Sequence, residues 1–454
     1  MKLLFVLHQF LPRYVTGTEQ YVRSLALGLR SRGHDVRVLA VEPQLHLLAP
    51  DRAWLESDEV VDGIPVRRIG VHHELVPNRE LLDHMNPLAG RQMARQLEEW
   101  PPDLVHVFHL RNLGLDGLLE PKRLGIPVVV NLMDFWFLCP RYTLLTGSGE
   151  LCTGPPEGGL GCIGCLDPEL GRLLEPLPRG LLRDLLSAEA EPDAARPLVD
   201  RCRALVGRKE RLLAALQQAD AVLAPSLFLR QMFENEGYPR GRIRHLPYGV
   251  DPERLAGRRR AFADRIELPL CLGYVGSLTR HKGLDVAISA LMSIEGDRWL
   301  LKVHGGLDAD PAYGRELLAQ AGGDERIRFE GPFRPTELGR VLEQLDLLLV
   351  PSIWYENTPF TILEAQMIGL PVAASDLGGI SEVVHPGQNG LLFEAGNPEA
   401  LARTVRAVLS DPEQLRSLQN NVPSRTLEEN LDDLERLYRE FVPGPAQEPG
   451  AEAP

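Results

Sequence analysis

Long apolar runs are absent from this sequence. No segment approaches the roughly 20 consecutive apolar residues that a membrane-spanning helix requires. At the start of the chain only Leu3 to Leu7 are apolar in succession, which is too short for the core of a signal peptide. We therefore expect a cytoplasmic protein that begins with a β-strand. Any membrane contact is expected to be peripheral, at the inner membrane face.

Basic residues and cysteines are also scarce. The chain has 49 Lys and Arg against 63 Asp and Glu, a formal net charge of −14, so the molecule as a whole would repel a phosphate backbone. Nucleic acid is therefore excluded as a partner. Only six cysteines are present, and structural disulfides are rare in the reducing compartment expected for this chain. Free thiols and metal ligands remain as the two options.

What the sequence does contain is a regular alternation of short apolar runs and helical stretches. With 454 residues, 44% of them hydrophobic, the chain can fill more than one core, because single cores stop growing at roughly 250 to 300 residues. Buried strands separated by helices predict parallel sheets covered on both faces. The predicted fold class is α/β, doubly wound, in two domains. The expected strands are KLLFVL, DVRVLAV, DLVHVF, PVVVNL and AVLAPS in the first half, and LCLGYVG, WLLKVHG, LLLVPS and PVAAS in the second.

Breaks in this alternation predict the domain limits. The first domain is expected over residues 1–250 and the second over 251–425, with the junction near His245 to Pro269, where turn residues meet a strongly charged stretch. Residues 140–200 are rich first in Gly, Pro and Cys and then in Leu, and they are expected to form an inserted subdomain. Residues 443–454 cannot bury apolar surface and are expected to be a disordered tail.

The segment over residues 351–384 carries the most specific pattern. The strand LLLVPS leads into a loop with Glu356, and Thr358 followed by Pro359 predicts an N-cap and a first helical residue. Glu364 then falls in the second helical turn. Glu356 projects from the carboxyl end of the strand, where ligands of open α/β sheets bind.

Two carboxylates thus lie on either side of a helix start, at which the free N–H groups of Phe360 and Thr361 would suit a diphosphate. Glu356 and Glu364, separated by seven residues and followed by GLPVAASDLGGISEVV, resemble the E-x7-E element of the family 4 glycosyltransferases. Those are retaining enzymes of the GT-B fold. The resemblance implies two Rossmann-like doubly wound domains that face each other across a cleft.

The resemblance also implies roles for this segment. Glu364 is expected to accept hydrogen bonds from the donor ribose hydroxyls, and Glu356 to lie beside the transferred hexose, since sugar hydroxyls are donors that a charged acceptor binds well. Asn357 and Thr358 join the expected substrate-binding residues.

Nearly the whole chain outside residues 140–200 and the tail shares this resemblance. It implies that residues 1–250 form the acceptor side and residues 251–425 bind the nucleotide sugar. Residues 426–442 would be a helix that crosses back to the first domain.

A second element, GYVGSLTRHKGLDVAISALM, resembles the family's G-R-x-x-x-x-K-G loop, in which an Arg and a Lys hold the leaving diphosphate. Lys282 matches the lysine and would neutralise a phosphate. The position of the arginine is Ser277, and Arg280, three residues on, is expected to replace it. Phe333, in IRFEGPF, stands where the family places the nucleotide base against main chain.

The first half contributes further expected cleft residues. Gly17 lies between a strand and a helix, where a backbone without Cβ could approach the donor phosphates. His106 and His109 lie at the end of the third expected strand, and His109 is the better cleft candidate. The segment NLMDFWF resembles the family's H-D element: Asp134 is kept, but the histidine is Met133, which is expected to affect donor choice or activity.

These residues predict a retaining glycosyltransferase that moves a sugar from a nucleotide diphosphate sugar to a hydroxyl of a glycan or lipid-linked acceptor, in cell-surface glycan or glycolipid assembly. The chemistry needs no cofactor, because Lys282, Arg280 and the helix start would stabilise the leaving group. Ser277 and Met133 leave open a second interpretation, a catalytically degenerate member that binds a nucleotide sugar or acts as a scaffold. A third, an epimerase of similar two-lobed fold, would not require the two glutamates.

Four of the six cysteines, Cys139, Cys152, Cys162 and Cys165, fall within 27 residues. Cys162 and Cys165 have the two-residue spacing of a metal knuckle, and an insert with many glycines has little else to order it. A structural zinc site is expected here. An iron–sulfur cluster uses similar ligands, and four free thiols are the remaining alternative.

Overall fold

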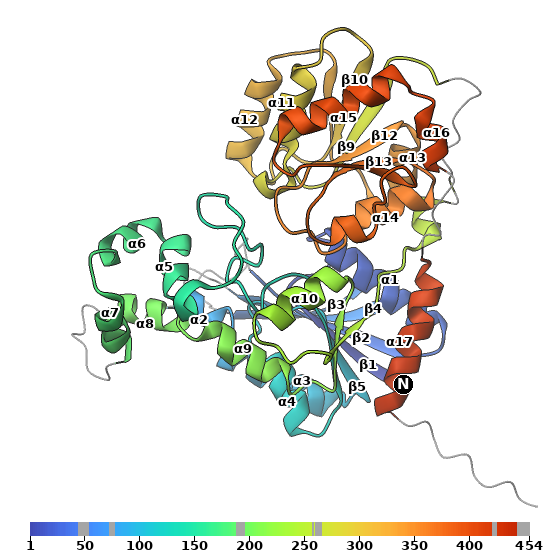
Figure 1. The fold of residues 1–454 in the computed structure, drawn as a ribbon. Helices are drawn as coiled ribbons and strands as arrows, with labels where there is room; N and C mark the ends of the chain where they lie inside the picture. The colour runs from blue at the N-terminus through green and yellow to red at the C-terminus, as the bar shows by residue number, and fades with distance from the viewer. Residues whose placement is uncertain are drawn as a thin grey trace, which may run out of the picture.

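The protein consists of two α/β lobes, each built on its own sheet (Figure 1). The computed structural model describes residues 1–43, 54–71, 78–187, 196–256, 258, 266–419 and 425–442. Within these residues the strand order is β3-β4-β2-β1-β5-β6-β7-β8 in the first sheet and β11-β10-β9-β12-β13-β14 in the second. All neighbouring strands are parallel except β3 and β4, which form an antiparallel hairpin. The prediction of a doubly wound α/β fold is confirmed.

The first sheet is buried on both faces, which follows from its continuous apolar strands. Along β1, Leu4 and Val6 face one core, while Leu3, Phe5 and Leu7 face the other. Five strands coincide with expected runs, and β3, β4 and β8 were not expected. The strands are β1 (Lys2–Leu7), β2 (Asp35–Pro43), β3 (Trp54–Val61), β4 (Ile64–Val71), β5 (Leu104–Val107), β6 (Val128–Asn131), β7 (Ala221–Ala224) and β8 (Ile243–His245).

Helices cover each face of the first sheet. Helices α3, α4, α9 and α10 supply side chains to the core on one face, and α1 supplies the opposite core. Their bounds are α1 (Gly17–Ser31), α3 (Pro87–Glu99), α4 (Asp116–Arg123), α9 (Arg208–Leu216) and α10 (Leu227–Asn235), with a short α2 (Arg79–Leu82).

The second lobe repeats this design. Helices α11, α12 and α15 pack on one face of its sheet, and α13 and α14 pack on the other. The strands are β9 (Leu270–Val275), β10 (Trp299–His304), β11 (Ile327–Gly331), β12 (Leu347–Val350), β13 (Val372–Ser375) and β14 (Gly390–Phe393). The helices are α11 (Leu284–Met292), α12 (Pro311–Ala321), α13 (Leu338–Glu343), α14 (Phe360–Met367), α15 (Pro398–Ser410) and α16 (Gln414–Gln419).

The expected insert contains four helices that project from the first lobe, drawn in green in Figure 1. They share a small core of their own, which includes Leu160, Leu170 and Leu182. They are α5 (Leu160–Leu166), α6 (Pro168–Leu174), α7 (Arg179–Ser187) and α8 (Arg196–Leu205). Residues 188–195 of the insert and the expected tail over 443–454 lie outside the described residues.

The last helix, α17 (Leu427–Phe441), returns to the first lobe and lies beside α1 (Figure 1). Its apolar face buries Leu431, Leu434 and Tyr438 completely in the core that α1 also lines. The two chain segments that cross between the lobes pair with each other, because Val250 N donates to Arg425 O at 2.9 Å and Leu427 N donates to Val250 O at 2.8 Å.

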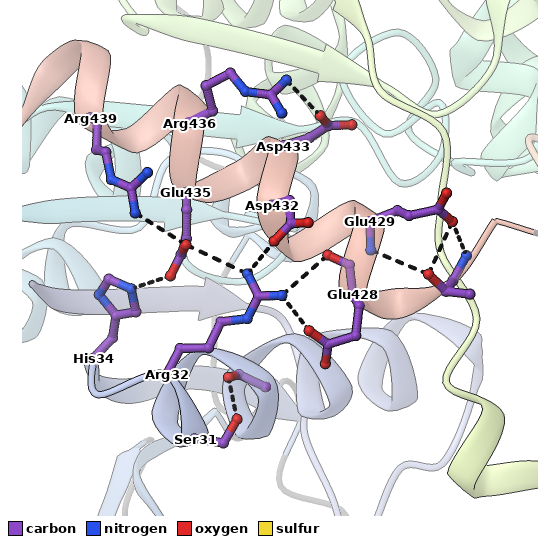
Figure 2. A network of polar contacts seen from close by, with 12 residues as sticks. Ser31, Arg32, His34, Glu428, Glu429, Asp432, Asp433, Glu435, Arg436 and Arg439 are labelled. Carbon is purple, nitrogen blue, oxygen red and sulfur yellow. Dashed lines mark hydrogen bonds and ion pairs between the residues drawn. The ribbon is translucent and has the colours of Figure 1, made fainter.

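Polar contacts border this helix pair, as Figure 2 shows. Arg32 donates to Asp432 Oδ1 at 2.7 Å and also pairs with Glu428, and His34 Nε2 lies 2.7 Å from Glu435 Oε1. Exposed ion pairs contribute roughly 0 to 1 kcal/mol each. Burial of the apolar face therefore dominates the attachment of α17. None of the helices in the described part of the chain has the length and apolar character needed to cross a membrane.

We expect Leu431→Ala to lower the free energy of unfolding by about 2 to 5 kcal/mol, the usual range for a fully buried leucine. Leu431 is 0% exposed and packs directly against Gly28 of α1. Urea denaturation would measure the effect. Leu318→Ala is the matched control, because Leu318 is 46% exposed on α12. Equal stability of the two variants would contradict this account of α17.

Candidate active site

The strand order locates the site. In the first sheet the order reverses between β1 and β5, and in the second between β9 and β12. Ligands of open α/β sheets bind at such switch points, outside the carboxyl ends of the strands. The loops from both switch points line one cavity of about 620 Å³ between the lobes. The expected residues in its lining are Gly17, His109, Asp134, Ser277, Lys282, Phe333, Glu356, Asn357, Thr358, Phe360, Thr361 and Glu364.

Glu356, which is buried, and Lys282, which is partly exposed, form an ion pair at the second switch point. Lys282 Nζ donates to Glu356 Oε1 at 2.7 Å, and Ser352 Oγ donates to the same oxygen at 2.7 Å. Burial by itself would raise the pKa of Glu356, but the charge and hydrogen bond of Lys282 and the bond from Ser352 bring that pKa below its usual value. The lowered pKa favours the ionised carboxylate of Glu356, which lies beside Lys282 in the cavity lining.

Gly283 allows the loop after β9, which carries Lys282, to touch the loop after β12, which carries Glu356. Gly283 has φ +69°, and a Cβ on it would lie 1.9 Å from Pro351 O. Only glycine tolerates both the left-handed backbone and this close approach. Ile353 N also donates to His281 O at 3.0 Å. The loop after β9 is thereby fixed against the loop after β12, which sets the distance between Lys282 and Glu356.

The start of α14 differs from the prediction by one residue. The helix begins at Phe360 with Pro359 as its N-cap, so the expectation that Thr358 caps the helix is wrong. Proline lacks a side-chain acceptor, and the loop turns into the helix one residue later. The hydroxyl of Thr358 is buried and has no hydrogen-bond partner among the described residues. It lines the cavity together with Phe360 and Thr361, whose N–H groups belong to the unpaired first turn.

Glu364, on the next turn of α14, is paired with a residue that the sequence did not reveal. Arg254 Nη1 lies 3.0 Å from Glu364 Oε1, and both residues line the cavity. Burial raises the pKa of Glu364 to about 7, against the opposing charge of Arg254. Arg254 lies 110 residues before Glu364 in the chain, in a short turn between the lobes. No local signal marked it.

On the opposite wall, His109 is oriented by Asp134. His109 Nδ1 accepts from the backbone N–H of Arg111 at 3.1 Å, which assigns the ring proton to Nε2, and Nε2 lies 3.1 Å from Asp134 Oδ2. The His8 ring packs against His109 with 4.1 Å between centroids. His106, by contrast, is fully buried and bonded to Tyr438 through its Nδ1 at 2.6 Å, outside the cavity lining.

Met133 occupies the position of the family's histidine and also lines the cavity. Its sulfur lies 3.3 Å from Tyr248 Oη and accepts from Asn131 Nδ2 at 3.0 Å. A thioether cannot donate a hydrogen bond to a sugar. The Met133 side chain therefore offers the cavity no hydrogen-bond donor.

Asn357 connects the lobes with its side chain. Its Nδ2 donates to Leu132 O at 3.4 Å and Met133 O at 3.3 Å, and its Oδ1 accepts from Ser226 Oγ at 2.8 Å. Glu382 adds a contact, because its carboxylate accepts from the backbone N–H of Leu227 at 2.8 Å. The loop that carries Glu356 is thus tied to the first lobe, and the Asn357 amide is already occupied by protein partners.

Phe360 makes one of the aromatic contacts between the lobes, as does Tyr355, whose ring lies 5.3 Å from that of Phe228. The Phe360 ring stacks on Tyr248 with 4.6 Å between centroids and lies 5.3 Å from Tyr21. A Cβ on Gly17 would lie 3.0 Å from the Phe360 ring. Gly17 therefore permits the close approach of α1 and α14 at the mouth of the cavity.

Arg280 is the expected site residue that the structure places elsewhere. Its guanidinium pairs with Glu316 of α12 and lies 5.0 Å from the Tyr313 ring centroid. Arg280 is not part of the cavity lining. The expectation that Arg280 replaces the arginine missing at Ser277 is therefore corrected. A short 3-10 turn over residues 280–282 directs Arg280 toward α12, whereas Lys282 lines the cavity.

The four clustered cysteines lie beside the first lobe's core. Cys139 and Cys162 are buried, Cys152 and Cys165 are partly exposed, and all are free thiols. Burial, together with neighbouring Cys139, Cys165 and Cys152, raises the pKa of Cys162 to about 12. In the described part of the chain, no three His, Cys, Asp or Glu side chains are arranged to hold a metal ion. The zinc site stays a prediction.

Comparisons with known proteins identify the family. Residues 16–249 match the glycosyl transferase 4-like domain, and residues 262–425 match the glycosyl transferases group 1 family. The chain belongs to this glycosyltransferase family. The first match covers the lobe with His109 and Asp134, and the second covers the lobe with Lys282, Glu356 and Glu364.

Named relatives support the same assignment. This glycosyltransferase chain is 30% identical over 401 residues to the D-inositol 3-phosphate glycosyltransferase of Nocardiopsis dassonvillei, a match that covers 82% of this chain and 80% of that protein. It is 32% identical over 246 residues to the protein of the same name from Nocardia farcinica, covering 51% of this chain and 52% of the relative. The chain thus spans about half the length of that relative.

Solved structures show the same fold. The sucrose-phosphate synthase of Thermosynechococcus elongatus has a TM-score of 0.65 at 19% identity, over 97% of this chain and 98% of that one. HepE of Anabaena in complex with UDP and glucose has a TM-score of 0.61 at 18% identity, over 97% and 100% of the two chains. The predicted GT-B fold is confirmed.

The metal prediction can be tested directly. Protein purified without chelator is expected to contain about one zinc per chain if the four thiols close around a metal, and iron in place of zinc would indicate a cluster. Elemental analysis measures both. Cys162→Ser/Cys165→Ser should then lose the metal and stability, while Cys271→Ser, in the second lobe, keeps both. A metal-free wild type whose stability the double variant leaves unchanged would refute the site.

Proposed function

We propose that the protein is a retaining glycosyltransferase that transfers a sugar from a nucleotide diphosphate sugar to a hydroxyl acceptor. The observation that carries the proposal is the ion pair of Lys282 and Glu356, which lines one cavity together with the hydrogen-bonded pair of His109 and Asp134. The first pair belongs to the lobe expected to hold the donor, and the second to the lobe expected to hold the acceptor.

The reaction breaks the bond between the sugar C1 and the diphosphate oxygen, and the diphosphate leaves with the electron pair. The acceptor oxygen bonds to C1 on the same face and gives its proton to the departing phosphate. Lys282 and the unpaired N–H groups at the start of α14 would stabilise the negative charge that develops on the leaving group. Asn357 and Phe360 hold the lobes together over the cavity, which would limit attack by water.

The acceptor is proposed to be a polyhydroxyl compound, in glycan or glycolipid assembly. Relatives named D-inositol 3-phosphate glycosyltransferase support a hydroxyl-rich acceptor. HepE, solved with UDP and glucose, makes UDP-glucose a sensible first donor to test. D-inositol 3-phosphate is likewise a sensible first acceptor.

Product analysis separates the proposed enzyme from the alternatives. A transferase releases nucleoside diphosphate at a rate that depends on the acceptor. A degenerate binder is stabilised by the nucleotide sugar in a thermal-shift panel but releases none. An epimerase would change the sugar and release no diphosphate. Retention is read from the anomeric configuration of the product by NMR.

Lys282→Ala should reduce the rate of transfer by about 10²-fold or more, the scale for removing one donor to developing charge. Arg280→Ala is the matched control from the same loop, and its rate should stay close to wild type because Arg280 is bound to Glu316 outside the cavity. Steady-state kinetics with saturating acceptor would measure both. Equal losses in the two variants would contradict the position of the leaving group beside Lys282.

Glu364→Ala should mainly lose affinity for the donor, whereas Glu356→Ala should mainly lose turnover. Glu364 lies on the helix beyond the phosphate-binding start, so its removal should weaken donor binding. Glu356 contacts Lys282 at the cavity floor, so its removal should lower turnover more than donor affinity. Calorimetric titration of donor and measurement of kcat separate the two effects. Wild-type rates and affinities in both variants would refute the assignment.

A further inference from the structure

The loop after β9 contributes one cationic side chain, that of Lys282, to the lining of the cavity. The loop after β9 offers Ser277 where the family has an arginine, and Arg280 of that loop is turned toward Glu316. Lys282 remains, but its ammonium group is shared with Glu356 at 2.7 Å. The cavity lining also contains two arginines, Arg111 from the first lobe and Arg254 from the turn that follows the crossing segment, and a second cation of this kind would strengthen the binding of a diphosphate.

Arg254 carries one of these guanidinium groups. The turn to which it belongs packs against the second lobe. This is a short 3-10 turn over Pro252–Leu255, directly after the segment that crosses between the lobes. The next residue, Leu255, is 1% exposed and packs in the core that includes Leu338 and Leu342 of α13. Arg254 thus moves with the second lobe, which also carries Lys282 and α14.

The side chain of Arg254 points toward α14. Its Nη1 lies 3.0 Å from Glu364 Oε1, and its side chain is 16% exposed in the cavity lining. Glu364 is one turn after Phe360, and a helical turn rises only about 5.4 Å. The guanidinium thus contacts the helix whose first residues, Phe360 and Thr361, also line the cavity.

A second observation points to a ligand at this place. The hydroxyl of Thr358, in a residue 8% exposed, has no hydrogen-bond partner among the described residues, although it lines the same cavity. A buried hydroxyl without a partner is costly unless a ligand or water satisfies it. Thr358, the first turn of α14 and Arg254 together offer uncharged and charged donors to one anion.

We propose that Arg254 binds the donor diphosphate in place of the arginine that is missing at Ser277. Its Nη1 lies 3.0 Å from Glu364 Oε1, and the planar guanidinium has five N–H donors in all, suited to bidentate binding of phosphate. Glu364 keeps acceptor capacity for the ribose hydroxyls while it orients Arg254. This inference rests on the proposed function, because it assigns a binding residue for the same donor.

The test compares ligands with and without the diphosphate. Calorimetric titrations with UDP, ADP and GDP identify the nucleotide that the wild type binds, and the corresponding nucleoside serves as the uncharged probe. Arg254→Ala should lose about 10- to 100-fold in affinity for the nucleoside diphosphate, the effect of one hydrogen bond to a charged group. Its affinity for the nucleoside should change less than about threefold.

A second pair of variants removes the effect of leaving Glu364 unpaired. Glu364→Gln has no carboxylate, so adding Arg254→Ala to it tests the guanidinium alone. The double variant should again lose about 10- to 100-fold in affinity for the nucleoside diphosphate relative to Glu364→Gln. Arg254→Lys, which keeps the charge without the planar fork, should bind with intermediate affinity. Unfolding midpoints close to wild type would show that each variant is folded.

Two outcomes would overturn the proposal, and they differ from failure of the proposed function. If Arg254→Ala weakens nucleoside and nucleoside diphosphate by the same factor, Arg254 only positions Glu364. If the double variant binds the diphosphate as well as Glu364→Gln does, the guanidinium does not contact phosphate. A wild-type chain that binds none of the three nucleotides would contradict the proposed function itself.

Discussion

The ion pair between partly exposed Lys282 and buried Glu356 is the interaction on which the site depends. A carboxylate that is 5% exposed costs several kcal/mol unless a cation and hydrogen bonds compensate it, and here Lys282 and Ser352 supply both. The pair joins loops that leave the neighbouring strands β9 and β12, and Gly283 lets those loops touch. The switch point of the second sheet is thereby held in one shape before any donor arrives.

The second lobe alone does not complete the cavity. Asn357, directly after Glu356, is bonded to main-chain oxygens of Leu132 and Met133, and Phe360 stacks on Tyr248. The loop with the proposed catalytic carboxylate therefore also makes polar contacts between the lobes. Any opening of the cleft would break the Asn357 contacts, so the geometry of Glu356 and closure of the lobes are coupled.

Departures from the family pattern have different consequences. Met133 replaces a donor with a thioether that Tyr248 and Asn131 approach, which changes what the first lobe can offer to a sugar. Ser277 removes a cation from a loop, but Arg254 lies on another element of the same lobe and faces the same cavity. A missing residue in a motif therefore does not by itself indicate a missing charge in the site.

The sequence by itself determined the fold class and the loops that line the cavity, because apolar periodicity and motif spacing are local. It also determined the strands β1, β2, β5, β6, β7, β9, β10, β12 and β13.

The sequence did not determine which atoms those loops bring together. Thr358 was expected to cap α14 and instead leaves its hydroxyl free, and Arg280 was expected in the cavity and instead pairs with Glu316. Only the tertiary structure brought Arg254 to Glu364, since their contact spans 110 residues and depends on how the crossing segment docks on α13. Spacing along a chain specifies neighbours on one element, whereas partners on different elements are fixed by packing.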